Sequence, residues 1–252
     1  MLIAVPVYIV RRFRGPWKMP EKLFSRAGLC LIVIEIFHYS VMSQVLSMWT
    51  DFPSLPLIVQ SAFLGLAAGL FFELGRFLVL DKLFSSVRSY KDAVYFGLGW
   101  NGVETFIVGL LLIVAVFGIN MLVTTDDVTS IYPDADKTQI EQIELFRASA
   151  IKMVNDEPYM GIVPVVERGT FMLMDVALTL IILFGFSRGT NVYAWYSVLF
   201  RAAFVGAVFA AQKINPLAGE LMFLIFAAAA YAVIWRMKQF YIAEKQPTKR
   251  GR

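Results

Sequence analysis

Six long apolar stretches, separated by short polar or proline-containing segments, dominate the pattern of the chain. Each is long enough to cross the hydrocarbon core of a bilayer as a helix, which takes about 20 residues. The predicted spans are residues 27–49, 57–80, 93–123, 160–186, 192–211 and 217–235. The pattern therefore predicts an all-α fold: a polytopic transmembrane helical bundle with six full spans, forming one domain over residues 1–252.

Two segments outside these spans have a pattern of their own. Residues 1–26 begin as a short apolar stretch, too short to span a bilayer, and continue as a basic segment. They lack the basic start and the cleavage site of a signal peptide. Residues 124–159 form one long acidic loop in which apolar positions recur at helical spacing. We expect an amphipathic helix at about 138–154, lying as a cap over the bundle.

Composition and charge support a membrane protein. Of the 252 residues, 58% are hydrophobic and 17% are charged, and the formal net charge is +4. A basic balance can indicate nucleic-acid binding, but here the basic residues gather in residues 11–26 and 81–92 and in a tail over 236–252. Membrane orientation explains this pattern better, because basic loops stay on the cytoplasmic side.

The charge pattern sets the expected location and partners. We expect an integral protein of a prokaryotic cytoplasmic membrane, with the basic tail cytoplasmic and the acidic loop on the opposite side. The expected partners are the lipid bilayer and other transmembrane helices or a membrane complex. We expect no nucleic-acid partner.

Ionisable side chains interrupt five of the apolar spans at a similar depth. With a rise of ~1.5 Å per residue, they fall in one layer within the half of the membrane predicted to be cytoplasmic. Ionisable groups in hydrocarbon need partners or water, so we expect the layer to line one polar cavity. Its members are Glu35, His38, Glu73, Glu104, Asp175 and Arg201, with Arg76 just below it.

Helical spacing groups these side chains on common faces. Glu73 and Arg76 are three residues apart and can pair on one helix. Two further stripes are Gly97, Asn101 and Glu104 in the third span, and Arg168, Asp175 and Thr179 in the fourth. For Glu167 and Arg168, near the outer end of the fourth span, we expect a local pair or a link to the acidic loop. Gly65 and Gly69 form a small-xxx-small pair and predict close helix packing.

These residues leave three classes of function open. In a membrane hydrolase, Glu73, Glu104 or Asp175 would act as a base, and Arg76 or Arg201 would stabilise developing negative charge. The alternatives are a cation or proton pathway lined by carboxylates, and a non-catalytic membrane subunit or scaffold that binds other transmembrane helices. Because His38 and Cys30 are the single histidine and cysteine of the chain, we expect no catalytic zinc site, no metal and no other cofactor.

The order of the polar motifs resembles the YhfC-like intramembrane peptidases, relatives of the CPBP/Abi membrane proteases. The resemblance runs from about residue 5 to residue 211. It rests on the Glu-x-Gly-Arg cluster ending at Arg76, the Gly-Leu-Gly-x-x-Gly-x-Glu cluster ending at Glu104, and an acidic loop followed by Glu167 and Arg168. The resemblance implies an intramembrane peptidase fold with a polar cavity.

The chain departs from the family pattern at five positions. Phe72 stands where the pattern has a first glutamate, and Trp100 and Asn101 stand where it has a histidine and a glycine. Histidines are also expected on the fourth and fifth spans, where the nearest matches are Asp175 and Arg201. We therefore expect a degenerate, catalytically inactive site, with Glu73, Glu104 and Asp175 as its remaining catalytic candidates and Arg76, Asn101, Arg201, His38 and Glu35 as their partners in the cavity.

Overall fold

The computed structural model describes residues 4, 7–8, 11–12, 21–125, 127–134, 136–156 and 163–245. The described part is helical and contains no β-strand, and six of its helices are long and apolar enough to cross a membrane. This confirms the predicted helical membrane bundle. Most of the predicted segment 1–26 and the last part of the predicted tail, residues 246–252, lie outside the described residues.

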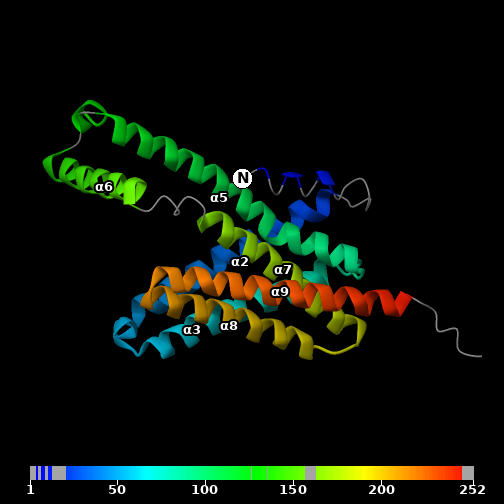
Figure 1. Cartoon of the computed structure of the whole chain (residues 1–252). Coiled ribbons are helices and arrows are strands. Elements are labelled where there is room, and N and C mark those ends of the chain that lie inside the picture. The colour runs from blue at the N-terminus through cyan, green and yellow to red at the C-terminus, as the bar shows by residue number, and fades with distance from the viewer. Residues whose placement is uncertain are drawn as a thin grey trace, which may run out of the picture.

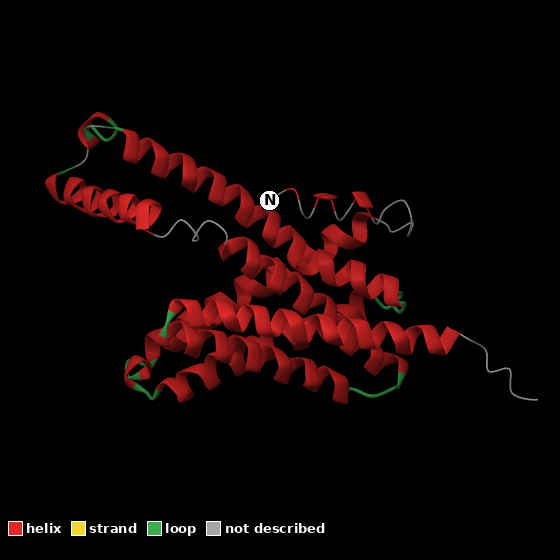
Figure 2. Ribbon diagram, viewed as in Figure 1, coloured by secondary structure: helices red, strands yellow, loops and turns green. Residues whose placement is uncertain are grey.

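The helices follow the predicted spans closely (Figures 1 and 2). They are α2 (Glu21–Met48), α3 (Leu57–Gly69), α4 (Gly75–Leu78), α5 (Tyr90–Thr124), α6 (Lys137–Asp156), α7 (Val163–Ser187), α8 (Val192–Ile214) and α9 (Pro216–Lys245). The last span differs most, since α9 continues ten residues beyond the predicted end at residue 235. Basic side chains such as Arg236 and Lys238 can extend from a helix end toward water, so their charge does not stop the helix.

The second span is one continuous run, Leu57–Leu83, whose hydrogen bonding changes along its length. α3 and α4 are joined by a π-helical turn at Leu70–Leu74, and a second π-helical turn at Val79–Leu83 follows α4. Such turns are rare and are frequent at functional sites. The first of them carries Glu73.

Close packing of helices depends on small residues. A Cβ atom built on Gly65 would lie 2.3 Å from the carbonyl oxygen of Ala202, and one on Gly69 would lie 2.5 Å from that of Val198. Both distances are too short for any side chain, so only glycine lets α3 and α8 approach this closely. The predicted small-xxx-small packing is confirmed. α7 is the central helix, with 78% of its apolar window buried.

α5 has two different halves. It begins at a capping box, in which the amide of Asp92 donates to Ser89 Oγ at 3.2 Å and the amide of Ser89 donates to Asp92 Oδ2 at 3.1 Å. The residues from 93 to 105 include most of its buried positions. The outer half is apolar, and much of its surface is exposed: Leu111 is 63% exposed and Phe117 is 70% exposed. At roughly 50 Å for 35 residues, α5 is longer than the hydrocarbon core is thick.

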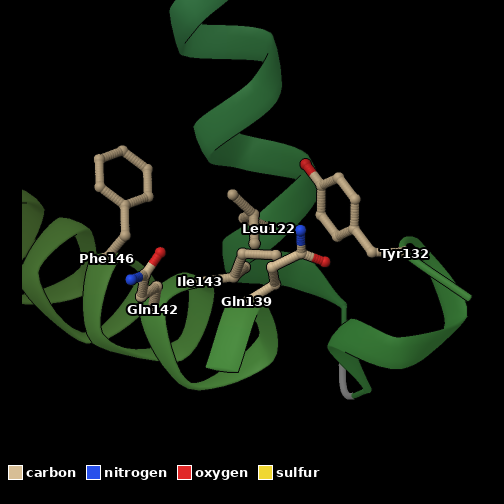
Figure 3. Close-up of a pocket in the computed structure, with 6 residues that line it drawn as sticks. All are labelled: Leu122, Tyr132, Gln139, Gln142, Ile143 and Phe146. Carbon is tan, nitrogen blue, oxygen red and sulfur yellow. The ribbon is translucent and has the colours of Figure 1, made fainter. Parts of the chain in front are cut away.

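α6 does not lie over the bundle as expected. It runs beside the outer half of α5, away from the other helices (Figures 1 and 2). Leu122 of α5 and Ile143 of α6 point toward one another beside a shallow pocket of about 540 Å³ (Figure 3). The end of α5 covers the apolar face of α6 only in part: Ile143 is half-buried, whereas Phe146 is 55% exposed.

The two ends of the bundle carry different charges. The helices reverse direction so that the chain near residues 21, 83–90, 187–192 and 245 lies at one end, here called the basic end. Its basic residues include Lys22, Lys82, Arg88, Lys91, Arg188, Arg236 and Lys238. The opposite end holds α6 and the described parts of the acidic loop.

Candidate functional site

Two carboxylates and two guanidinium groups form a closed network at the centre of the bundle, here called the buried network. Glu73 follows α3 in the π-helical turn, Arg76 belongs to α4, Asp175 to α7 and Arg201 to α8. Their exposed fractions are 0%, 0%, 1% and 4%, respectively. Burial of four charged side chains is tolerable only because they satisfy one another.

Each acid of the buried network contacts both arginines. Arg201 Nε donates to Glu73 Oε1 at 3.0 Å, and Arg76 Nη1 lies 3.2 Å from Glu73 Oε2. Asp175 Oδ1 accepts from Arg76 Nη2 and from Arg201 Nη2. The predicted pair between Glu73 and Arg76 is present. The two positive and two negative charges balance.

The backbone of α7 helps to hold the buried network. Arg76 Nη1 donates to the carbonyl oxygen of Asp175 at 3.2 Å, and Thr179 Oγ1 donates to the same oxygen at 2.7 Å. Gly97 of α5 permits this arrangement, since a Cβ atom there would lie 2.8 Å from that carbonyl oxygen. The guanidinium of Arg76 also lies over the Trp100 ring, 5.0 Å from its centroid.

A second charged cluster lies on the neighbouring faces of α5 and α7. Arg168 Nη1 donates to Glu104 Oε1, and Asn101 Nδ2 donates to Glu104 Oε2 at 3.0 Å. Thr105 Oγ1 donates in turn to Asn101 Oδ1 at 2.8 Å. Glu35 of α2 lines the same cavity as Glu104. The side chains of Glu104 and Arg168 are 18% and 22% exposed, so this cluster is less enclosed than the buried network.

One cavity of about 250 Å³ connects the two groups of charges. Its polar lining comes from α2, α5, α7 and α8, and its apolar lining includes Phe72 and Phe171. The polar residues that line it are Glu35, His38, Asn101, Glu104, Arg168, Asp175 and Arg201. The tertiary structure thus gathers into one place side chains that the sequence distributes over four helices.

The structure brings the candidate site residues together, but only some of them line the cavity. Glu104 and Asp175 line the cavity, whereas Glu73 lies behind it and reaches it only through Arg201. Arg76 likewise lies behind the cavity wall. The catalytic roles of Glu73, Glu104 and Asp175 stay predictions.

Arg168 has a different partner from the one expected from the sequence. We expected a local pair or a contact with the acidic loop, but Arg168 faces inward and pairs with Glu104. The spacing indicates the inward orientation, because Arg168 stands seven residues before Asp175 and so lies on the same face of the helix. The packing of α5 against α7 decided the partner.

His38 is a separate case. Its ring packs between Phe71 and Phe72, with centroid distances of 5.1 and 5.0 Å. Its Nε2 atom is buried, and no hydrogen-bond partner reaches it from the described residues. It lines the cavity without contacting the charged clusters.

The donor set is poorly suited to a metal ion. Within the described residues, no group of three or more histidine, cysteine, aspartate or glutamate side chains is placed to hold one. Glu73 and Asp175 are each in contact with two guanidinium groups, which would repel a cation. The arrangement can bind polar groups and hold them out of lipid.

Comparison with known proteins gives two matches. The sequence profile of the YhfC intramembrane metalloprotease family matches residues 1–239. The chain is also similar to YhfC, a membrane protein of Bacillus subtilis, with 24% identity over 184 residues. That match covers 69% of this chain and 66% of the Bacillus protein, slightly less than two thirds of its length. No solved structure matches the chain at a significant level.

Proposed function

The chain belongs to the YhfC intramembrane metalloprotease family, and we propose that it is a member that binds another transmembrane helix at its cavity without cleaving it. One observation carries the proposal. The carboxylates of Glu73 and Asp175, which would serve as base or ligand, are both neutralised by Arg76 and Arg201 inside the buried network. Each carboxylate is held in ion pairs with both guanidinium groups, and these positive charges oppose the approach of a metal cation.

The departures from the family pattern support this reading. Asp175 and Arg201 are themselves members of the buried network. Trp100 covers the guanidinium of Arg76, and Phe72 lies under that of Arg201, 5.7 Å from its ring centroid. These four departures therefore belong to one contact network.

The metal that the family name implies does not fit these residues. A catalytic zinc normally takes three protein ligands, and these are mostly histidines. The single histidine, His38, packs between two phenylalanine rings and contacts none of the cavity carboxylates. We therefore route no step of the proposed function through a metal.

The bare half of α5 supports the binding role. Ile107 and Leu111 follow Glu104 by three and seven residues on the same helix face and are 40% and 63% exposed. This apolar strip leads to the side of the cavity where Glu104 and Arg168 are partly exposed. A transmembrane helix lying along the strip would reach the polar cavity from within the bilayer.

The first test is proteolysis by purified protein in liposomes that contain a transmembrane substrate. We expect no cleavage. Replacing Glu104 by glutamine leaves Arg168 without its ionic partner, so we expect thermal stability to fall by about 2–4 °C, on the order of 1 kcal/mol for a chain of this size. Glu144→Gln, on the exposed face of α6, is the matched control and should leave stability unchanged.

Two results would reject the inactive-site proposal. One is cleavage that Glu104→Gln abolishes while thermal stability is unchanged. The other is stoichiometric zinc in metal analysis of the purified protein, because the proposal leaves no ligand set for it.

We further propose that the basic end faces the cytoplasm of a prokaryotic cell and that the acidic loop lies on the opposite side. The charge difference between the two ends supports this orientation. In a Cys30→Ala background, Asp136→Cys should react with a membrane-impermeant thiol reagent added outside intact cells. Lys238→Cys should react only after the cells are opened. Reaction of position 136 from the cytoplasmic side alone would reverse the topology.

A further inference from the structure

A groove of about 400 Å³ lies on the surface of the bundle between α8 and α9, which run side by side (Figure 1). It is here called the α8–α9 groove, and it shares no residue with the cavity. Ile181 of α7 is buried and forms its floor. Tyr193 and Tyr196 of α8 line one wall, and Ala232 and Arg236 of α9 line the other. The lining is apolar apart from Arg236 and the two tyrosine hydroxyl groups.

Exposed aromatic rings place the mouth of this groove at the boundary between hydrocarbon and water. Trp195, Tyr196 and Trp235 are each more than half exposed and lie toward the basic end of α8 and α9. Tryptophan and tyrosine gather where a membrane meets water. Arg236 directly follows Trp235, so its guanidinium group reaches the headgroup layer. Ala232 lies one helical turn deeper, in the hydrocarbon.

Arg236 presents a cation suited to a phosphate group at this mouth. Its guanidinium group lies over the Phe240 ring, 5.1 Å from the centroid. An aromatic ring offers no oxygen atom to the five N–H donors of a guanidinium group. No carboxylate of the described residues pairs with Arg236. A guanidinium group in this state can donate two parallel hydrogen bonds to a phosphate.

We propose that the α8–α9 groove binds an anionic phospholipid, with its phosphate at Arg236 and an acyl chain along Ile181 and Ala232. A phospholipid has its charge at the boundary and its chain below it, and the groove has the same order of charged and apolar parts. The other basic residues of this end favour a headgroup with a net negative charge over a zwitterionic one. The apolar part below Arg236 distinguishes the groove from a site for a soluble phosphate.

The test counts the phospholipids bound to the purified, delipidated protein in detergent by native mass spectrometry. The protein is titrated with phosphatidylglycerol or with phosphatidylcholine of the same acyl chains. We expect the first phosphatidylglycerol to bind about fivefold more tightly than the first phosphatidylcholine, as for the attraction of one basic side chain to anionic lipid. Equal affinity of the two lipids would overturn the proposal.

Two pairs of variants locate the site. Arg236→Gln should abolish the preference for phosphatidylglycerol, whereas Lys238→Gln, the same loss of charge at an exposed position outside the groove, should keep it. Ala232→Trp fills the groove and should weaken binding of the first lipid of either kind at least about tenfold, as for two methylene groups lost from an apolar site. Ala228→Trp, exposed one turn deeper and outside the groove, is its control. All four positions are exposed, so the unfolding temperature should stay unchanged.

Three further outcomes would assign the groove to another occupant and overturn the lipid site. One is competition by glycerol phosphate at the affinity of phosphatidylglycerol, which would indicate a soluble phosphate. Another is the mass of a dimer that Ala232→Trp abolishes, which would indicate a second copy of this chain. The third is displacement of phosphatidylglycerol, at equal affinity, by a transmembrane peptide with an aspartate near its end, which would indicate a partner helix.

Discussion

Replacing Arg201 by methionine is expected to destabilise the protein more than any other single change considered. Arg201 donates to Glu73 Oε1 and to Asp175 Oδ1, and it is itself only 4% exposed. Removing one partner from a buried ionic group leaves an uncompensated charge and costs about 3–5 kcal/mol. For a chain of this size the unfolding temperature should fall by roughly 10 °C, measured by thermal unfolding in detergent.

A compensated variant tests the cause of this loss. Combining Arg201→Met with Glu73→Gln restores equal numbers of positive and negative charges in the buried network. We expect the double variant to recover at least about half of the lost stability, since paired sites in one network are strongly non-additive. Lys213→Met, near the end of the same helix and exposed, is the control and should change stability by less than about 0.5 kcal/mol. A loss below about 1 kcal/mol for Arg201→Met would contradict the network.

The second large effect is expected from Gly97→Ala. The added methyl group would lie 2.6 Å from the Cα atom of Val176 and 2.8 Å from the carbonyl oxygen of Asp175. Both are backbone atoms that cannot move without shifting α7, so the cost should reach about 1–3 kcal/mol. The same shift displaces the carbonyl that accepts from Arg76 and Thr179. The variant should therefore lose binding of a partner transmembrane helix as well as stability.

Gly118→Ala supplies the matched control for Gly97→Ala. It adds the same methyl group to the same helix at a position where nothing lies within 4 Å. Because alanine is the better helix former by about 1 kcal/mol, this variant should be neutral or slightly more stable. Thermal unfolding of the two variants should give changes of opposite sign. Equal effects would show that α5 and α7 are not packed through Gly97.

The conclusion that the site binds rather than cleaves depends on which arginine meets which acid. In a catalytic arrangement at least one carboxylate would be free to take a proton or hold an ion. Here Arg76 and Arg201 occupy both acids of the buried network, and Arg168 occupies Glu104.

The sequence by itself determined the class of fold. A run of about 20 apolar residues must cross the bilayer as a helix, because every backbone group in hydrocarbon needs an internal hydrogen bond. The six spans follow from that rule. The pair of Glu73 and Arg76 follows from the geometry of a single helix, in which residues three apart face the same way.

Only the tertiary structure decided the partners between helices. Arg76 and Asp175 are 99 residues apart in the chain, and Arg168 and Glu104 are 64 apart. Their contact depends on how each helix is rotated and tilted, which is set by close approaches at Gly65, Gly69 and Gly97. The sequence does not predict that α6 lies beside α5, because an amphipathic pattern shows which face of a helix is apolar and not which element packs against it.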